Sequence, residues 1–157
     1  MKYKINDKEK INLNLEFNKR VEEKFGIVLG DAILAENFLA QKYYQLIEKY
    51  NLKNGNNIFL YLTEKNLFSE NESLLNRVYG KTYYFSIKLG IVTLYENSLT
   101  WKNTAIHEIG HMFGLKHEDK EECYMHFLKR NQKKFCKECA QKLEFFNKRT
   151  IRSFINE

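Results

Sequence analysis

Proline is absent from this chain of 157 residues, and cysteine occurs only three times. Without proline, the turns must be formed by Asn, Gly, Asp and Ser. Residues 1–8 lack the apolar core of a signal peptide, and an odd number of cysteines in such a chain argues against a disulfide framework. No apolar run approaches the length of a membrane span. These absences predict a cytoplasmic protein that does not cross a membrane.

Aromatic residues are plentiful, with twelve phenylalanines and ten tyrosines. A chain of this length can bury a sizeable core as one domain, which we expect to span residues 1–157. The formal net charge is +6, and the excess lies from position 126 onward, where nine Lys and Arg face three Glu. A solvated helix face explains such a tail better than a nucleic-acid site, because no recognition motif accompanies it. Nucleic acid is therefore not an expected partner.

Three of the four histidines lie within residues 107–117. On an α-helix, His107 and His111 are one turn apart on the same face, so their imidazoles can share one metal ion. Glu108 is rotated away from that face. It can instead reach a water on the metal, which is the place of a general base.

His117 can join the other two histidines only if the helix ends before it. Gly114 supplies the expected end, because glycine readily adopts the left-handed conformation that closes helices. The ligand set is then three neutral imidazoles with one open position for water. That pattern is typical of catalytic zinc.

Hydrophobic periodicity predicts a mixed α/β or α+β fold, with helices against one mixed, twisted sheet of about five strands. Apolar residues recur every three or four positions over 34–50, which indicates an amphipathic helix. The apolar run at 58–63 is typical of a central strand, and 66–76 is expected to be a loop. Further strands are expected at 11–17, 27–33, 78–86 and 91–95, and further helices at 18–25, 99–113 (capped by Asn97 or Ser98) and 137–155.

The motif His-Glu-x-x-His-x-x-Gly-x-x-His at 107–117, with Met125 behind it, resembles that of the metzincin metalloproteases. More narrowly, the chain is similar to the archaemetzincins, which place a Cys-x-Met shortly after the third histidine and a Cys-x-x-Cys further on. Residues 123–127 and 135–139 match these two pieces, and 62–68 with 78–80 look like the family's strand-loop-strand segment. The resemblance implies a compact metzincin-like domain with an active-site helix and a metal-binding region at 107–139.

Individual roles follow from the resemblance. It implies that His107, His111 and His117 bind the catalytic zinc and that Glu108 is the general base. Met125 is implied as the methionine of the turn beneath the histidines, supporting them without touching the metal.

The resemblance also implies a second, structural zinc held by the three thiols, Cys123, Cys136 and Cys139. The family's usual pattern has a cysteine directly after the third histidine, where this chain has Glu118. Zinc in structural sites takes four ligands, so Glu118 is expected as the fourth by its position, with Asp119 and His126 as alternatives. An empty site with reduced thiols and a redox pair are the competing interpretations, but no thioredoxin-like context precedes the Cys-x-x-Cys.

The function expected from these features is that of a zinc-dependent metallopeptidase, either an endopeptidase or an aminopeptidase. Glu108 would take a proton from a water bound to the zinc of the three histidines as this water attacks a peptide carbonyl, and would pass it to the leaving amine. The alternative is a zinc-stabilised module that binds a peptide or partner without cutting it. Peptides or unfolded proteins are the expected substrates, pairing with a free strand edge near 91–95, and the chain is expected to be a monomer.

Overall fold

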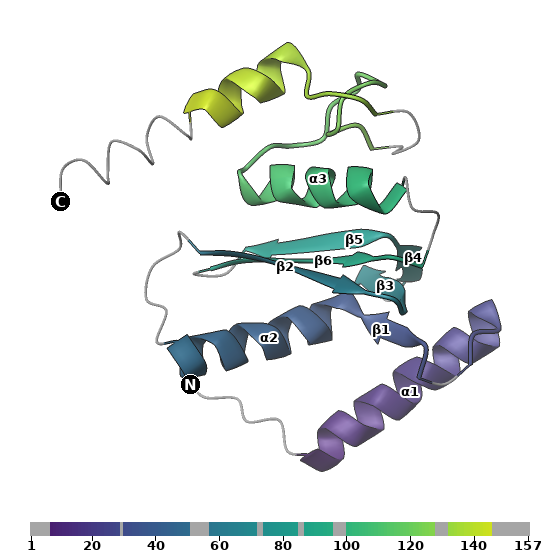
Figure 1. Cartoon of the computed structure of the whole chain (residues 1–157). Coiled ribbons are helices and arrows are strands. Elements are labelled where there is room, and N and C mark those ends of the chain that lie inside the picture. Colours follow the sequence, from purple (N-terminus) through teal and green to yellow (C-terminus); the bar gives the residue numbers. More distant parts are fainter. Residues whose placement is uncertain are drawn as a thin grey trace.

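A computed structural model describes residues 7–28, 30–50, 57–71, 74–84, 87–95, 100–127 and 132–145. A layer of strands separates α2 on one side from α3 on the other (Figure 1). The elements in chain order are α1 (Asp7–Phe25), β1 (Ala32–Leu34), α2 (Ala35–Tyr50), β2 (Ile58–Thr63), β3 (Asn66–Asn71), β4 (Leu74–Val78), β5 (Gly80–Tyr84), β6 (Lys88–Thr93) and α3 (Thr100–Met112). A last helical segment at 137–145 lies beyond α3, farthest from α1 (Figure 1).

The strands form two small mixed sheets. In one sheet, β3 pairs parallel with β1 and antiparallel with β4. In the other, β6 pairs parallel with β2 and antiparallel with β5. The expected α+β class is confirmed, but the described part of the chain has six strands in two sheets where a single sheet of about five was expected.

The main core lies between α2 and the strands. Leu39 and Leu46, on one face of α2, pack with Leu67, Leu89 and Ile91. Burying one such side chain stabilises the fold by about 1.5–3 kcal/mol. The predicted amphipathic helix over 34–50 is confirmed, and its apolar stripe explains why it lies against the sheet.

The prediction of a strand at 11–17 was wrong. These residues belong to α1, which runs from Asp7 to Phe25 and also contains the short helix expected at 18–25. Phe17 and Val21 are four residues apart, so they share one helix face, and both are buried against Phe68 and Leu75. This tertiary packing overrides the local alternation of apolar and polar residues. Where a strand was expected at 27–33, the structure has the shorter strand β1, from Ala32 to Leu34.

The prediction of a loop at 66–76 was also wrong, since the described residues of this segment belong to the antiparallel strands β3 and β4. Residues 66–69 are all buried, because α2 packs on β3, β1 pairs beside it, and Phe17 and Val21 of α1 pack against Phe68. Polar residues such as Asn66 and Ser69 hide this burial in the sequence.

The sequence predicted a central strand at 58–63 and a free strand edge near 91–95, but the structure has β6 in the centre of the sheet and β2 at its edge. β2 is an edge strand, and Leu62 on it is half exposed. β6 is the central strand, because Ile91 pairs with Tyr61 on one side and Lys81 on the other. The free edge expected near 91–95 is therefore not provided by β6.

The active-site helix expected at 99–113 corresponds to α3. It packs mainly on β5 and β6, with Met112 fully buried. The expected caps at 97 and 98 lie outside the described residues, as does the part of the last helix beyond 145. Among the described residues, no helix has both the length and the apolar character needed to span a bilayer.

Candidate metal centres

The C-terminal end of α3 turns the chain back on itself. Gly114 has a φ of +80°. The N–H of Leu115 donates to the carbonyl of Gly110 at 3.0 Å, and the N–H of Gly114 donates to that of His111 at 2.7 Å. This pair of bonds is a Schellman motif, which satisfies the last carbonyls of the helix and reverses the chain. The reversal places His117 beside the two histidines of α3.

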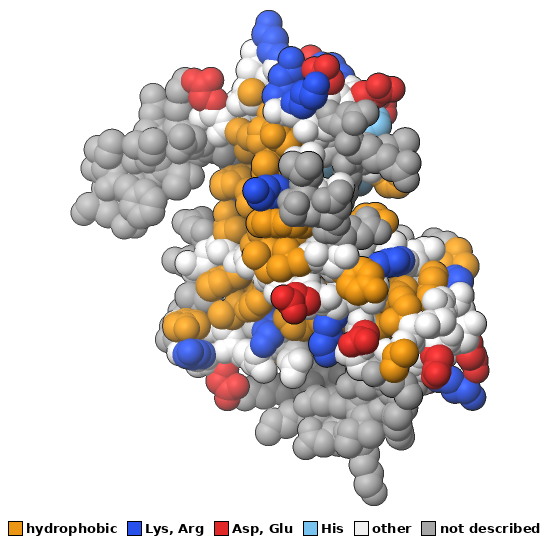
Figure 2. Space-filling model, turned by 45° about the vertical axis from the view of Figure 1, so that its right-hand side comes forward, with side chains coloured by type: hydrophobic (Ala, Val, Ile, Leu, Met, Phe, Trp, Pro, Cys, Tyr) orange, Lys and Arg blue, Asp and Glu red, His pale blue; other side chains and the backbone are white. Residues whose placement is uncertain are grey.

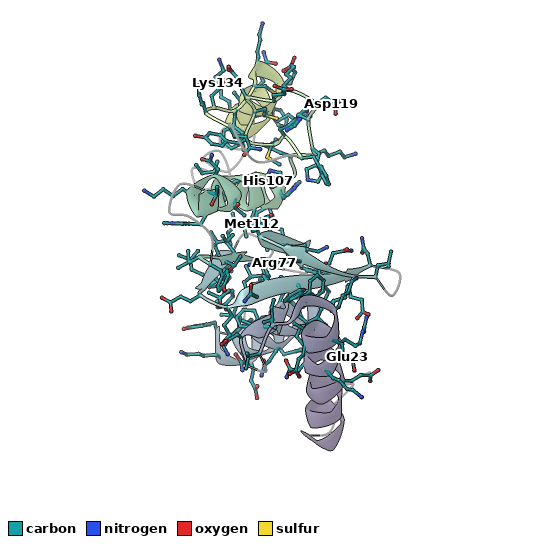
Figure 3. All side chains as sticks on the ribbon, turned by 90° about the vertical axis from the view of Figure 1, so that its right-hand side faces the viewer. Glu23, Arg77, His107, Met112, Asp119 and Lys134 are labelled. Atoms are coloured by element: carbon teal, nitrogen blue, oxygen red, sulfur yellow. The ribbon has the colours of Figure 1, made fainter. Side chains whose placement is uncertain are left out.

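Three imidazoles meet at this turn. The Nε2 atom of His111 lies 3.0 Å from Nε2 of His107 and 3.1 Å from Nε2 of His117. His107 is buried, whereas His117 is exposed. In Figure 3, His107 lies on the side of α3 that faces the later segment with Asp119 and Lys134, whereas Met112 lies towards the sheet. Figure 2 shows histidine side chains reaching the surface. The cluster therefore has an open side.

Hydrogen bonds to the Nδ1 atoms of His107 and His111 determine which nitrogen of each ring carries the hydrogen. Nδ1 of His107 lies 2.7 Å from the carbonyl of Tyr124, and Nδ1 of His111 lies 2.8 Å from that of Leu115. A carbonyl can only accept, so each Nδ1 carries the hydrogen and donates it. In neutral rings, the two Nε2 atoms then face each other with lone pairs. Such bonds to the second nitrogen are typical of metal-bound histidines.

The cluster fits zinc. Two nitrogens bound to one tetrahedral zinc at about 2.0–2.1 Å stand roughly 3.3–3.4 Å apart. The observed distances of 3.0 and 3.1 Å are slightly shorter. Converging lone pairs repel each other unless a cation lies between them, and zinc is the cation that imidazole sites of this kind favour.

Glu108 lies on another face of α3 and does not belong to the histidine group. Its side chain is only 4% exposed. The hydroxyl of Thr82 on β5 donates to Oε2 of Glu108 at 2.7 Å. The carboxylate is therefore held between α3 and β5, next to His107 in the sequence, and is not one of the converging ligand atoms.

Met125 packs directly beneath α3. It is fully buried, and its carbonyl accepts a hydrogen bond from the N–H of Glu118 at 2.9 Å. A β-carbon on Gly110 would lie only 2.4 Å from its sulfur. Gly110 thus makes room for Met125. The sequence analysis did not identify this role of Gly110. The available signal was a glycine inside a helix, which costs about 1 kcal/mol and usually has a packing reason.

A second group consists of Cys123, Cys136 and Cys139, whose sulfurs lie within 4.8 Å of one another. All three are buried, and none of them forms a disulfide bond. The backbone N–H groups of Cys136 and Met125 donate to the sulfur of Cys123 at 3.3 and 3.4 Å. Burial alone would raise the pKa of Cys123, but these hydrogen bonds outweigh it and lower the pKa below its ordinary value. Burial raises the pKa of Cys139. Three close sulfurs, one of them with a lowered pKa, suit a soft cation such as zinc.

No carboxylate joins the three thiols among the residues described in the structure. An oxygen of Glu118, the expected fourth ligand, lies 4.0 Å from the ammonium group of Lys142. Asp119 is exposed, and the imidazole of His126 is in neither metal-binding group. Coordination by Glu118 therefore stays a prediction that this arrangement does not favour.

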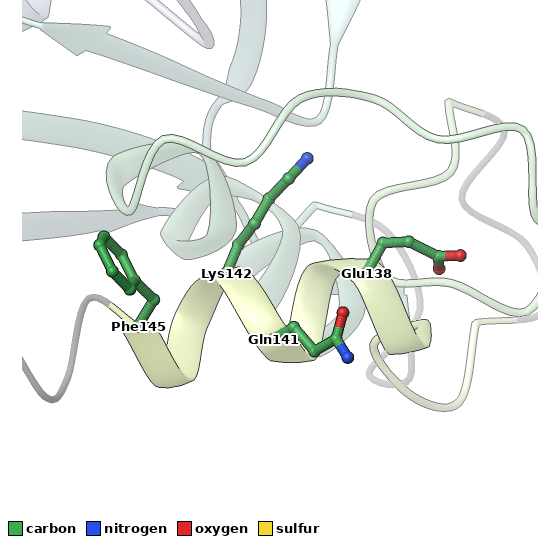
Figure 4. Close-up of a pocket in the computed structure, with 4 residues that line it drawn as sticks. All are labelled: Glu138, Gln141, Lys142 and Phe145. Atoms are coloured by element: carbon green, nitrogen blue, oxygen red, sulfur yellow. The ribbon is translucent and has the colours of Figure 1, made fainter.

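A shallow hollow lies along the outer face of the last helix. It is lined by Glu138, Gln141, Lys142 and Phe145 (Figure 4). These side chains share one face of the helix, whereas Cys139 is buried with the other thiols. The hollow contains no member of either metal-binding group.

The sequence was compared with known proteins. The model of peptidase family M54 matches residues 99–145, which include both groups of ligands. The archaemetzincin of Methanocaldococcus jannaschii is 28% identical over 162 residues, covering 85% of this chain and 88% of that protein. The resemblance to the archaemetzincins is confirmed. The expected enzyme class, a zinc metallopeptidase, is confirmed with it, and zinc suits both groups of ligands in this archaemetzincin-like chain.

A solved structure was also found. The crystal structure of a zinc-dependent peptidase from Methanocorpusculum labreanum covers 85% of this chain and 70% of its own, at 23% identity and a TM-score of 0.48.

Proposed function

We propose that this chain hydrolyses peptide bonds, with His107, His111 and His117 holding a catalytic zinc and Glu108 acting as general base. The observation that carries the proposal is the convergence of the imidazoles. The two rings on α3 point their Nε2 atoms toward each other, because each Nδ1 is hydrogen-bonded to a backbone carbonyl. Two imidazole nitrogens that converge to 3.0 Å, each ring held through its other nitrogen, form an arrangement typical of a metal site.

When bound, zinc supplies a Lewis acid that acidifies water and polarises a carbonyl. The protein supplies the rest. Glu108 accepts a proton from the attacking water and returns it to the leaving amine. Its burial keeps the carboxylate away from competing solvent. The carbonyls of Tyr124 and Leu115 hold the two rings of α3 in one orientation.

The thiol group holds a second zinc with a structural role in this proposal. Cys123 lies two residues before Met125, whereas Cys136 and Cys139 flank the beginning of the last helix. A metal bound by all three would tie the turn at Met125 to that helix. The turn also carries Tyr124, whose carbonyl orients His107. The second zinc would thereby stabilise the first site indirectly.

Extended peptide segments are the substrates that the architecture favours. β5 is an edge strand of its sheet and passes Glu108 at Gly80 and Thr82. An extended peptide can add to such an edge through backbone hydrogen bonds. The exposed His117 leaves the site accessible to a chain lying across it. Peptides and unfolded segments can pair in this way more readily than folded proteins, whose backbone hydrogen bonds are already formed internally.

The test is turnover of a broad peptide library by the zinc-loaded protein. Cleavage is expected in the parent and should disappear on chelation. Glu108→Gln should retain zinc but lose at least about 10²-fold in kcat, because a positioned general base contributes roughly 10²–10⁴-fold. A Gln variant that cleaves at the parent rate, or a zinc-loaded parent that cleaves nothing, would overturn the proposal.

A further inference from the structure

Strand β5 meets α3 at Glu108 through two residues on one face. Side chains alternate along a strand, so Gly80 and Thr82 point to the same side. A β-carbon on Gly80 would lie 2.8 Å from Oε1 of Glu108 and 2.7 Å from its Cγ. The absence of a side chain at position 80 therefore makes the space that the Glu108 side chain occupies.

The second residue provides a directed bond. The hydroxyl of Thr82 lies 2.7 Å from Oε2 of Glu108 and 3.2 Å from its backbone carbonyl. A hydroxyl has one hydrogen to donate. The shorter contact is to the charged group, and hydrogen bonds to carboxylates are stronger than those to neutral carbonyls. The hydrogen therefore goes to Oε2.

We propose that Thr82 is a positioning residue that fixes the carboxylate of Glu108 for its role as general base, in a niche opened by Gly80. This inference rests on the proposed function. A glutamate side chain has three rotatable bonds, and a base must lie within hydrogen-bond reach of the proton it takes. The Thr82 hydroxyl holds one oxygen from the sheet side, which limits the rotation of the carboxylate. Catalysis depends on such orientation, since misplacement by about 1 Å can cost 10²-fold.

The motif at 107–117 gives no indication of this role. Thr82 lies 26 residues before Glu108 and outside any recognisable pattern. The two residues meet only because β5 pairs with β6 and α3 packs across both strands. Thr82 contributes through Glu108 and is not proposed to touch the substrate.

The experiment compares Thr82→Val, which keeps the shape, with Thr82→Ser, which keeps the hydroxyl. In the zinc-loaded protein, Thr82→Val should lower kcat about ten- to hundredfold with KM within about twofold, because only the alignment of the base is lost. Thr82→Ser should stay within about threefold of the parent in kcat. Zinc content should be unchanged in both. Thr93→Val is the matched control, because this threonine lies on β6 of the same sheet but its hydroxyl donates to the carbonyl of Lys65, between β2 and β3, and not to Glu108. It should lower Tm without lowering kcat.

A second readout does not depend on activity. Thermal unfolding of the parent, Thr82→Val, Glu108→Ala and the double variant forms a double-mutant cycle. The Tm shifts of the single variants should not add, because each removes the same hydrogen bond. Thr82→Ala replaces the valine variant in both tests if Thr82→Val does not fold.

The outcomes separate the two proposals. Additive Tm shifts, an unchanged kcat in Thr82→Val, a change confined to KM, or equal loss in Val and Ser would each overturn the positioning role while leaving the peptidase intact. A zinc-loaded parent without turnover would overturn both the proposed function and the role of Thr82 in it.

Discussion

The sulfur of Met125 occupies the place next to Gly110 where any other residue would carry a β-carbon, at 2.4 Å from that position. The contact joins the last turn of α3, between His107 and His111, to the turn that follows the third histidine. Because that turn also supplies the Tyr124 carbonyl to His107, we expect the packing of one sulfur atom to affect the orientation of a proposed metal ligand.

Gly110→Ala should therefore destabilise the protein. Alanine favours helix over glycine by about 1 kcal/mol, but overpacking a tight site costs typically about 1–3 kcal/mol. We expect a net loss of stability of up to about 2 kcal/mol and weaker zinc binding, measured by thermal unfolding and zinc titration. In the double variant with Met125→Ala, the clash is absent, so adding the alanine at 110 should no longer destabilise. Equal losses in both backgrounds would show that Met125 is not the obstacle.

His117→Ala should release the catalytic zinc more readily, because two imidazoles remain of three. Elemental analysis after dialysis against a weak chelator should find about one zinc fewer per chain than in the parent. His126→Ala is the matched control, since this imidazole belongs to neither metal-binding group. Full zinc content in His117→Ala would mean that something else completes the site.

Cys136→Ser should remove the second zinc while leaving the first in place, since the hydroxyl of serine is a far poorer ligand than a thiolate. Stoichiometry by elemental analysis should fall from about two zinc ions to about one. Tm should fall as well, because metal binding contributes to folding.

Glu118→Gln is the comparison for the cysteine variant. The carboxylate lies near Lys142 and outside the thiol group, so both zinc ions should be retained. Loss of one zinc in Glu118→Gln would instead support its predicted role as the fourth ligand.

Glu138 should make stability depend on pH in the acid range. Its carboxylate accepts a hydrogen bond from Lys120, which lowers its pKa from 4.5 to about 2. A depressed folded-state pKa contributes stability that is fully present above the unfolded value and is lost as pH falls through the folded one. The Tm difference between parent and Glu138→Gln should thus be present at about pH 6 and fade between about pH 4.5 and 2.

Salt provides the control for this ion pair. Both partners are about half exposed, so screening should shrink the Tm difference at about pH 6 as ionic strength rises. A difference that is independent of both pH and salt would have to arise from packing.

The predictions from sequence succeeded where the deciding interactions are local. The amphipathic stripe of α2 and the extent of α3 follow from spacings of three and four residues along one helix. They failed where partners come from far away. The segment at 11–17 alternates like a strand but is helical, because Phe17 and Val21 pack under β3 and β4. The polar-looking Asn66 and Ser69 are buried by pairing and by helices that no local pattern reveals.

By itself the sequence determined the helix-turn unit: two histidines one turn apart, a glutamate beside the first, and a glycine able to close the helix. These depend on the 3.6-residue repeat and on one backbone conformation, both of which are local properties. Only the tertiary structure decided what surrounds that unit, including the carbonyl of Tyr124 on His107, the sulfur of Met125 against Gly110 and the hydroxyl of Thr82 on Glu108. Those contacts join residues 15 to 26 positions apart, and strand pairing and helix packing bring them together.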